Sequence, residues 1–146
     1  MSRLILAIDQ GTGGTKTVLF NETGGIVSKA TIPLRSYYPR TGFVEQDPLD
    51  LYHNVLASVG QCLAAASQIL PQAARQVAAV GISNQRETFV LWDAEGNPIC
   101  NAVVWQCKRS VPVCERLKGT HVEAEVRART GLIIDPYFSG AKLSWL

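Results

Sequence analysis

The chain has 146 residues, 47% of them hydrophobic, which is enough to bury the core of one domain. Its formal net charge of +2 comes without a basic stripe or an acidic tail, so charge favours neither nucleic acid nor a membrane surface as a partner. The first apolar run, residues 4–8, is too short for a signal-peptide core or a bilayer span, which predicts a cytoplasmic protein.

Cysteine and histidine do not form a metal-ligand pattern. The four cysteines lack Cys-x-x-Cys pairing, and neither histidine lies at a metal-ligand spacing from them: Cys62, Cys100, Cys107, Cys114, His53 and His121. We therefore expect buried free thiols.

Residues 4–20 predict strand, turn, strand around a glycine-rich turn. Gly11, Gly13 and Gly14 let backbone N–H groups approach an anion closely, hydroxyls at Thr12 and Thr15 add donors, and Lys16 adds a compact positive charge. These are the parts of a phosphate cradle. Asp9, at the carboxyl end of the first strand, could hold a hydrated Mg²⁺ beside the phosphates.

Two common phosphate loops do not fit this turn. The dinucleotide motif Gly-x-Gly-x-x-Gly lacks its third glycine and would open a helix, whereas a β-prone run follows here. A P-loop needs glycine immediately before the lysine, where this chain has Thr15. A plain β-hairpin with a flexible polar turn stays open as the alternative.

The next segments predict a third antiparallel strand and a long helix. Residues 26–32 alternate loosely as a strand does. Asp47 and Pro48 then have the residue types of an N-cap and a first helical position, and Asp50 complements the helix dipole. Apolar residues at helical spacing carry this helix to about Ile69, before Pro71.

Further strands and helices follow in the second half. Residues 77–83 read as a central strand that is buried on both faces and reached by a crossover. Residues 88–92 read as a strand, residues 102–105 as a short strand or extended piece, and residues 110–117 and 122–129 as helices. Ser139 is a candidate cap for a last helix whose apolar face begins with Leu143 and Leu146.

Polar and aromatic side chains follow the predicted strands in a pattern that suits a polyol. Arg86 and Glu87 lie beyond the carboxyl end of residues 77–83, where an open α/β sheet usually binds its ligand. A guanidinium can donate to two hydroxyls while a carboxylate accepts from one. Trp105 would supply a flat apolar wall and Tyr137 a hydroxyl. A solvated turn for the charged pair, and core packing for the two aromatic residues, stay open as alternatives.

Five ordered segments carry a resemblance to a known family: DQGTGGTK at 9–16, GFVEQDP at 42–48, ISNQRET at 82–88, NAVVWQCKR at 101–109 and TGLIIDPYFSGAKLSWL at 130–146. Together they resemble the N-terminal part of the FGGY carbohydrate kinases, on the glycerol-kinase branch. The resemblance implies an α/β fold similar to the ribonuclease-H-like domain of the actin and hexokinase superfamily, with a mixed sheet of three antiparallel and then parallel strands and crossover helices.

The same resemblance implies an activity and residue roles. The activity is ATP-dependent phosphorylation of glycerol to glycerol 3-phosphate, with Mg²⁺. Arg86, Glu87, Trp105 and Tyr137 match the glycerol-binding positions. In the phosphate turn, Thr12, Gly13, Gly14 and Lys16 face the nucleotide phosphates, and Asp9 helps to place Mg²⁺. The family commonly has hydroxyl residues at the positions of Gly13 and Gly14 and arginine at that of Lys16, which predicts changed nucleotide affinity.

The chain ends inside a helical pattern, so we expect residues 1–146 to be a truncated N-terminal domain. The family's catalytic base and its C-terminal nucleotide-binding domain would lie beyond Leu146, and the isolated chain is then expected to be inactive. Two other functions stay open: a non-catalytic module that binds phosphate or a polyol, and a kinase for another polyol or a pentulose. Self-association as a homo-oligomer through exposed Trp145 and Leu146 also stays open.

Overall fold

The structure, a computed structural model, describes residues 3–146, which form two compact units. Unit 1 holds residues 3–35 and 47–85, and unit 2 holds residues 36–46 and 86–146. The assignment of residues 1–146 to a single truncated N-terminal domain stays a prediction.

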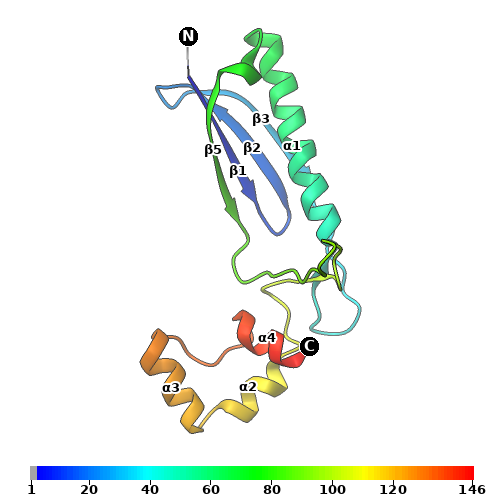
Figure 1. The fold of residues 1–146 in the computed structure, drawn as a ribbon, viewed down its shortest axis with the longest axis vertical. Helices are drawn as coiled ribbons and strands as arrows, with labels where there is room; N and C mark the ends of the chain where they lie inside the picture. Colours follow the sequence, from blue (N-terminus) through cyan, green and yellow to red (C-terminus); the bar gives the residue numbers. More distant parts are fainter. Residues whose placement is uncertain (1–2) are drawn as a thin grey trace. The chain divides into compact units, whose positions relative to one another are not determined.

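Unit 1 is built on a four-stranded mixed sheet in the order β3-β2-β1-β5 (Figure 1). Strands β1 (Leu4–Gln10), β2 (Gly14–Phe20) and β3 (Ile26–Pro33) form the predicted antiparallel meander. Strand β5 (Val77–Asn84) runs parallel to β1, as a crossover through a helix requires. This arrangement confirms the mixed α/β fold class expected from the sequence.

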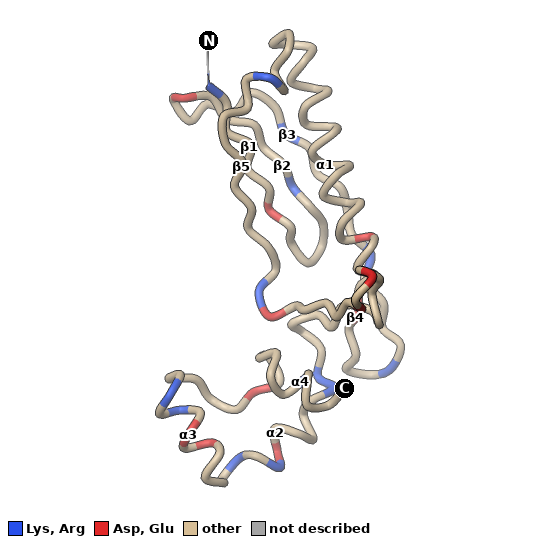
Figure 2. Tube along the Cα trace, viewed as in Figure 1, with Lys and Arg blue, Asp and Glu red and all other residues tan. Residues whose placement is uncertain are grey.

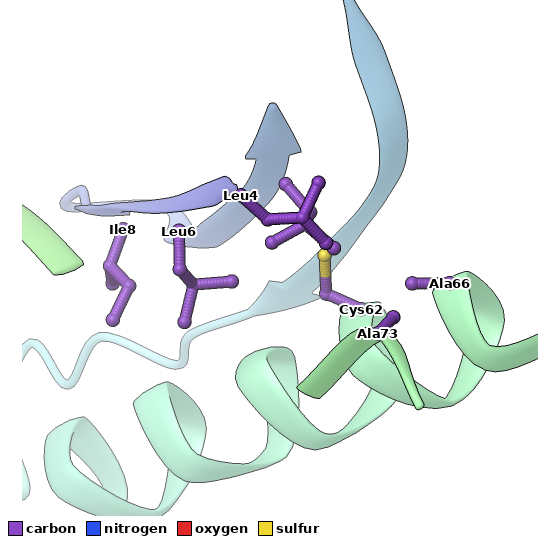
Figure 3. Close-up of a cluster of buried hydrophobic side chains, with 7 residues drawn as sticks. Leu4, Leu6, Ile8, Cys62, Ala66 and Ala73 are labelled. Carbon is purple, nitrogen blue, oxygen red and sulfur yellow. The ribbon is translucent and has the colours of Figure 1, made fainter. Parts of the chain in front are cut away.

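Helix α1 (Pro48–Ile69) packs on one face of this sheet, mainly over β2 and β3. Asp47 is its N-cap, since the carboxylate accepts from the Leu49 N–H at 2.8 Å, and Pro48 begins the helix as predicted. Alternate residues of β1 point at the helix and pack with residues of α1 and of the short 3₁₀ helix η1 (Ala73–Gln76) (Figure 3). The core they form contains Leu4, Leu6, Ile8, Leu19, Cys62, Ala66 and Ala73.

Strand β5 departs from the prediction that it is buried on both faces. It lies at the edge of the described sheet, and seven of its eight residues, Ala78 to Asn84, are exposed. Val80 and Ile82 are 57% and 69% exposed because α1 packs on β2 and β3 and does not extend over β5. A continuous apolar run therefore predicted the strand and its direction correctly, but its burial wrongly.

Unit 2 consists of a two-stranded sheet and three short helices. Strands β4 (Glu45–Gln46) and β6 (Ala102–Val103) pair antiparallel. Helices α2 (Val111–Leu117), α3 (His121–Thr130) and α4 (Ser139–Trp145) follow in sequence. A small apolar core gathers beside β6 and contains Val44, Val103, Val104 and Cys107.

The strand predicted over residues 88–92 is absent from the described structure. Only two isolated bridges form there, Phe89 with Val103 and Trp92 with Pro98. The predicted turn that follows does form: the Asp93 carboxylate accepts from the Asn97 N–H at 2.7 Å. Hydrogen bonds from Asn97 lower the pKa of Asp93.

A part-buried ion pair joins β4 to the loop before α2. The Arg109 guanidinium donates to Glu45 at 2.5 Å, and only 5% of the Arg109 side chain is exposed. The guanidinium also lies over the rings of Phe43 and Trp145, 4.6 and 5.1 Å from their centroids. Asn101 supplies a further donor to Glu45.

Charge and hydropathy give the described chain a mixed surface. Basic and acidic positions are interspersed along the trace (Figure 2). Among residues 3–146, none of the helices combines the length and the apolar character that a membrane crossing needs. All four cysteines are free, as predicted, but only three are buried as expected, since Cys100 is half-buried.

We predict that the two neighbouring glycines of the β1–β2 turn respond differently to serine. A Cβ atom at residue 14 would lie 2.5 Å from the Ile32 carbonyl oxygen of β3, whereas a Cβ at residue 13 meets nothing within 4 Å. Gly14→Ser should therefore lower the free energy of unfolding by about 1–3 kcal/mol, and Gly13→Ser by less than about 0.5 kcal/mol. Urea denaturation of both variants measures this difference, and equal losses would contradict it.

We also predict that Glu45→Gln destabilises unit 2. The change removes the charge that pairs with a buried guanidinium and should cost about 1.5–3 kcal/mol of unfolding free energy. Glu115→Gln is the matched control, since Glu115 pairs with Lys118 on the surface with 61% of its side chain exposed. The prediction fails if chemical denaturation gives the same midpoint for both variants.

Candidate functional site

The glycine-rich turn between β1 and β2 is a tight hairpin. The Gly11 N–H donates to the Gly14 carbonyl at 2.9 Å, and the Leu34 N–H donates to the Gly13 carbonyl at 3.1 Å. Thr12 is half-buried and Gly13 is exposed, so the tip of the turn is open to a ligand.

Thr15 does not belong to the open side of the turn. Its side chain is fully buried, in the alternation that also buries Thr17 and Leu19 on the helix-covered face. The expectation that its hydroxyl donates to a phosphate is therefore wrong, because a residue next to Lys16 on a strand must point to the opposite face.

Asp9 and Lys16 face each other across the hairpin on the sheet face opposite α1. They are cross-strand partners, both are exposed, and no hydrogen bond or ion pair joins them in the described structure. They line an open hollow together with residues of β1, β2 and β5, namely Ala7, Ile8, Val18, Phe20, Gly81, Ile82 and Ser83. A cation and an anion side by side suit a phosphate that carries a metal ion.

The donor set at Asp9 fits one kind of metal ion. No group of three or more metal-ligating side chains occurs among residues 3–146, which argues against a site made wholly of protein ligands there. Mg²⁺ binds through one or two carboxylates and keeps several waters, so the single exposed carboxylate of Asp9 is compatible with it.

The turn after β5 carries Arg86 and Glu87 with an unusual backbone. Glu87 has φ of 61°, one of two positive values among the non-glycine residues described. Such a conformation is uncommon for a residue with a Cβ and is found often at ligand sites. Arg86 is exposed, and its guanidinium makes no hydrogen bond or ion pair within the described chain.

Ser139 holds Glu87 from the start of α4. Its N–H donates to Glu87 Oε2 at 3.1 Å, and its hydroxyl lies 3.0 Å from the same oxygen and 3.3 Å from the Glu87 carbonyl oxygen. The prediction that Ser139 caps the helix is wrong: Phe138 occupies the N-cap position, and the serine is the first helical residue. The serine hydroxyl binds a distant carboxylate instead of the N–H groups of its own helix.

Trp105 and Tyr137 lie together in unit 2. Their ring centroids are 5.9 Å apart in an edge-on arrangement at 68°, and both residues are half-buried. The backbone N–H of Trp105 donates at 3.1 Å to the hydroxyl of Thr88, which follows Glu87. The structure thus links Glu87, Trp105 and Tyr137 within one unit, and their role in binding a polyol stays a prediction.

Lys142 is a residue near this site that the sequence reading missed. It is fully buried, and its ammonium donates to the Tyr137 carbonyl at 2.6 Å. Burial lowers the pKa of Lys142, opposed by nearby groups that include Glu87. The sequence predicts that the apolar face of this helix begins with Leu143 and Leu146, but these side chains are 48% and 52% exposed. A lysine gives no sequence signal of burial.

A comparison with protein families matches residues 4–146 to the N-terminal domain of the FGGY family of carbohydrate kinases. The chain is 50% identical to a glycerol kinase of Ralstonia nicotianae and 43% identical to glycerol kinase 1 of Thermotoga maritima. Each match covers 97% of this chain and 28% of the relative. The chain thus spans less than a third of the length of these relatives.

Solved structures of kinases share the fold. A crystal structure named as a xyloylose kinase from Brucella ovis matches with a TM-score of 0.83 and 28% identity over 98% of this chain and 29% of that one. Plasmodium falciparum glycerol kinase with ADP matches with a TM-score of 0.81 and 27% identity over 99% of this chain and 28% of that one. From the family match and these likenesses, the chain belongs to the FGGY family of carbohydrate kinases.

Proposed function

We propose that the protein carrying this chain transfers the γ-phosphoryl group of ATP to a terminal hydroxyl of glycerol and forms glycerol 3-phosphate in the cytoplasm. The observation that carries the proposal is the grouping of Glu87, Trp105 and Tyr137 in unit 2. The two relatives named above, at 50% and 43% identity, are glycerol kinases, which supports glycerol as the acceptor.

In this proposal the residues of unit 2 bind and orient the triol. Glu87 accepts a hydrogen bond from one hydroxyl, and the exposed guanidinium of Arg86 donates to two others. Trp105 lies against the carbon face, and the hydroxyl of Tyr137 adds a polar contact. Fixing the acceptor in this way lowers the entropic part of the barrier to transfer.

The turn of unit 1 binds the nucleotide phosphates. Thr12 donates from its hydroxyl, Gly13 and Gly14 allow close approach of the backbone, and Lys16 supplies a point charge. Asp9 would hold Mg²⁺, which when bound neutralises charge on the phosphate oxygens.

The base that accepts the hydroxyl proton is assigned to a part of the protein outside this chain. Glu87 is engaged by Ser139 and is assigned to positioning of the acceptor. We therefore propose that residues 1–146 alone have no appreciable kinase activity, and that the C-terminal part supplies the adenine site and the base. Detectable glycerol-dependent turnover by the isolated chain would overturn this assignment.

A second candidate is an FGGY kinase for a pentulose or another polyol. The likeness to the Brucella ovis structure named as a xyloylose kinase favours it, because the fold and the phosphoryl chemistry would be the same. Phosphorylation of glycerol, xylulose and erythritol by the intact protein, compared by kcat/KM, separates the two.

A third candidate is a non-catalytic module that binds phosphate or a polyol. The mass of the native polypeptide tests it, through an antibody to this segment and mass spectrometry of the captured product. A product several times larger than 15.9 kDa supports a kinase. A product near 15.9 kDa supports the module.

We predict that Glu87→Gln in the intact protein lowers kcat/KM for glycerol roughly 10- to 100-fold, because a neutral amide accepts a weaker hydrogen bond than a carboxylate. KM for ATP should stay within about twofold. Glu115→Gln is the control, an exposed glutamate in α2 of the same unit. Unchanged kcat/KM for glycerol in Glu87→Gln would remove Glu87 from the acceptor site.

We further predict that Gly13→Thr tightens nucleotide binding. Residue 13 has open space around its Cβ direction, so a threonine there can add a hydroxyl donor to the turn without displacing neighbours. One added hydrogen bond should lower the dissociation constant for ADP by about two- to tenfold, measured by calorimetry on the intact protein. A weaker affinity would show that this position does not face the phosphates.

A further inference from the structure

The first four residues of helix α4 bring two polar side chains to the candidate polyol site, and neither has an assigned role. We propose that Ser139 and Lys142 are positioning residues for the acceptor: Ser139 fixes Glu87, and Lys142 fixes Tyr137. The proposal rests on the proposed function and deepens it, since it names what sets the geometry of the acceptor site.

Ser139 fixes both the side chain and the backbone of Glu87. Its N–H donates to Oε2, and its single hydroxyl proton is shared between Oε2 at 3.0 Å and the Glu87 carbonyl oxygen at 3.3 Å. Within the described residues these bonds use only one carboxylate oxygen, so Oε1 is left to accept from a ligand. A carboxylate with one oxygen bound in this way has a defined direction for its other oxygen.

The backbone conformation of Glu87 explains why it needs to be held by Ser139. A glutamate with φ of 61° is strained, and residues in this region persist only when their surroundings hold them. Ser139 lies far along the chain from Glu87 and supplies such a hold at the carbonyl of the strained residue. Without it, the turn can relax and carry the carboxylate away from the site.

Lys142 is buried at a cost that packing alone does not explain. An ammonium away from water is unfavourable, and an apolar side chain of similar length would fill the same space. Its bond to the Tyr137 carbonyl, at 2.6 Å, fixes the residue whose ring lies against Trp105. We infer that the lysine is used to set the position of that ring.

The spacing of Ser139 and Lys142 along α4 lets them act together. Positions three apart lie on the same face of a helix, so one turn of α4 reaches Glu87 through Ser139 and Tyr137 through Lys142. A shift of α4 would therefore move Glu87 and Tyr137 together.

The test measures KM and kcat for glycerol and for ATP in the intact protein. Ser139→Ala and Lys142→Met should each raise KM for glycerol about tenfold, with kcat and KM for ATP within about twofold of the wild type. Ser139→Thr retains the hydroxyl and should stay within about threefold in KM for glycerol.

Matched controls come from the same unit. Ser144→Ala changes an exposed serine on α4, and Lys118→Met changes an exposed lysine at the end of α2. Both should leave all four constants unchanged. If KM for glycerol in Ser139→Ala equals that in Ser144→Ala, the proposal is overturned for Ser139. A parallel rise in KM for glycerol and ATP would mean a structural role only and would overturn it too.

The proposed function can fail separately. If the wild-type protein phosphorylates xylulose or erythritol instead, glycerol is the wrong acceptor, and the same variants are measured with the accepted polyol. If it phosphorylates none of these compounds, the proposed function fails. Amide hydrogen exchange at Ser139 then tests whether Ser139 binds Glu87. Glu87→Ala should speed that exchange at least tenfold relative to Glu115→Ala, and equal rates would show that it does not.

Discussion

The alternation of side chains along β1 is the constraint on which unit 1 depends. Leu4, Leu6 and Ile8 must face α1 to form the core, so Asp9 has to face the other side of the sheet. The antiparallel register with β2 then places Lys16 opposite Asp9 on that open face. Packing of apolar residues thereby fixes where the two charged residues of the phosphate turn can point.

Unit 2 uses a different means to place its candidate site residues, because its apolar core is small. Hydrogen bonds and ring contacts between segments far apart in sequence hold the turn at Glu87, the loop at Trp105 and the start of α4. Polar networks of this kind specify one geometry when every member is satisfied. They also make the geometry sensitive to the loss of a single hydroxyl.

The sequence predicted those features that depend on neighbours along the chain. Asp47 and Pro48 mark the start of α1 because capping and proline geometry are local, and the glycine-rich turn predicts a hairpin for the same reason. The exposure of Val80 and Ile82 could not be predicted, because it depends on where α1 packs rather than on β5 itself. Residues 88–92 have strand-forming side chains but lack a partner strand of sufficient length.

The candidate site, like the fold, could be predicted from the sequence only in part. Motif positions indicate Glu87, Trp105 and Tyr137, and the structure brings these together. Their binding roles, like those of Arg86 and the phosphate turn, stay predictions. A serine before a helical pattern predicts a cap, whereas Ser139 is the first helical residue and binds Glu87 instead. Lys142 could not be found from the sequence, because burial of a lysine depends on tertiary contacts that no local pattern encodes.

The register of β1 has a consequence for the order in which the chain folds. Asp9 pairs with Lys16 in β2 and with Ser83 in β5. The edge of β1 that pairs with β2 therefore has a partner nearby in the sequence, whereas the edge that pairs with β5 has a distant one. Contacts between distant segments form later because a longer loop has to close first. During synthesis the hairpin of β1 and β2 can therefore form before α1 is complete, while the second edge of β1 stays available to other strands until β5 has left the ribosome.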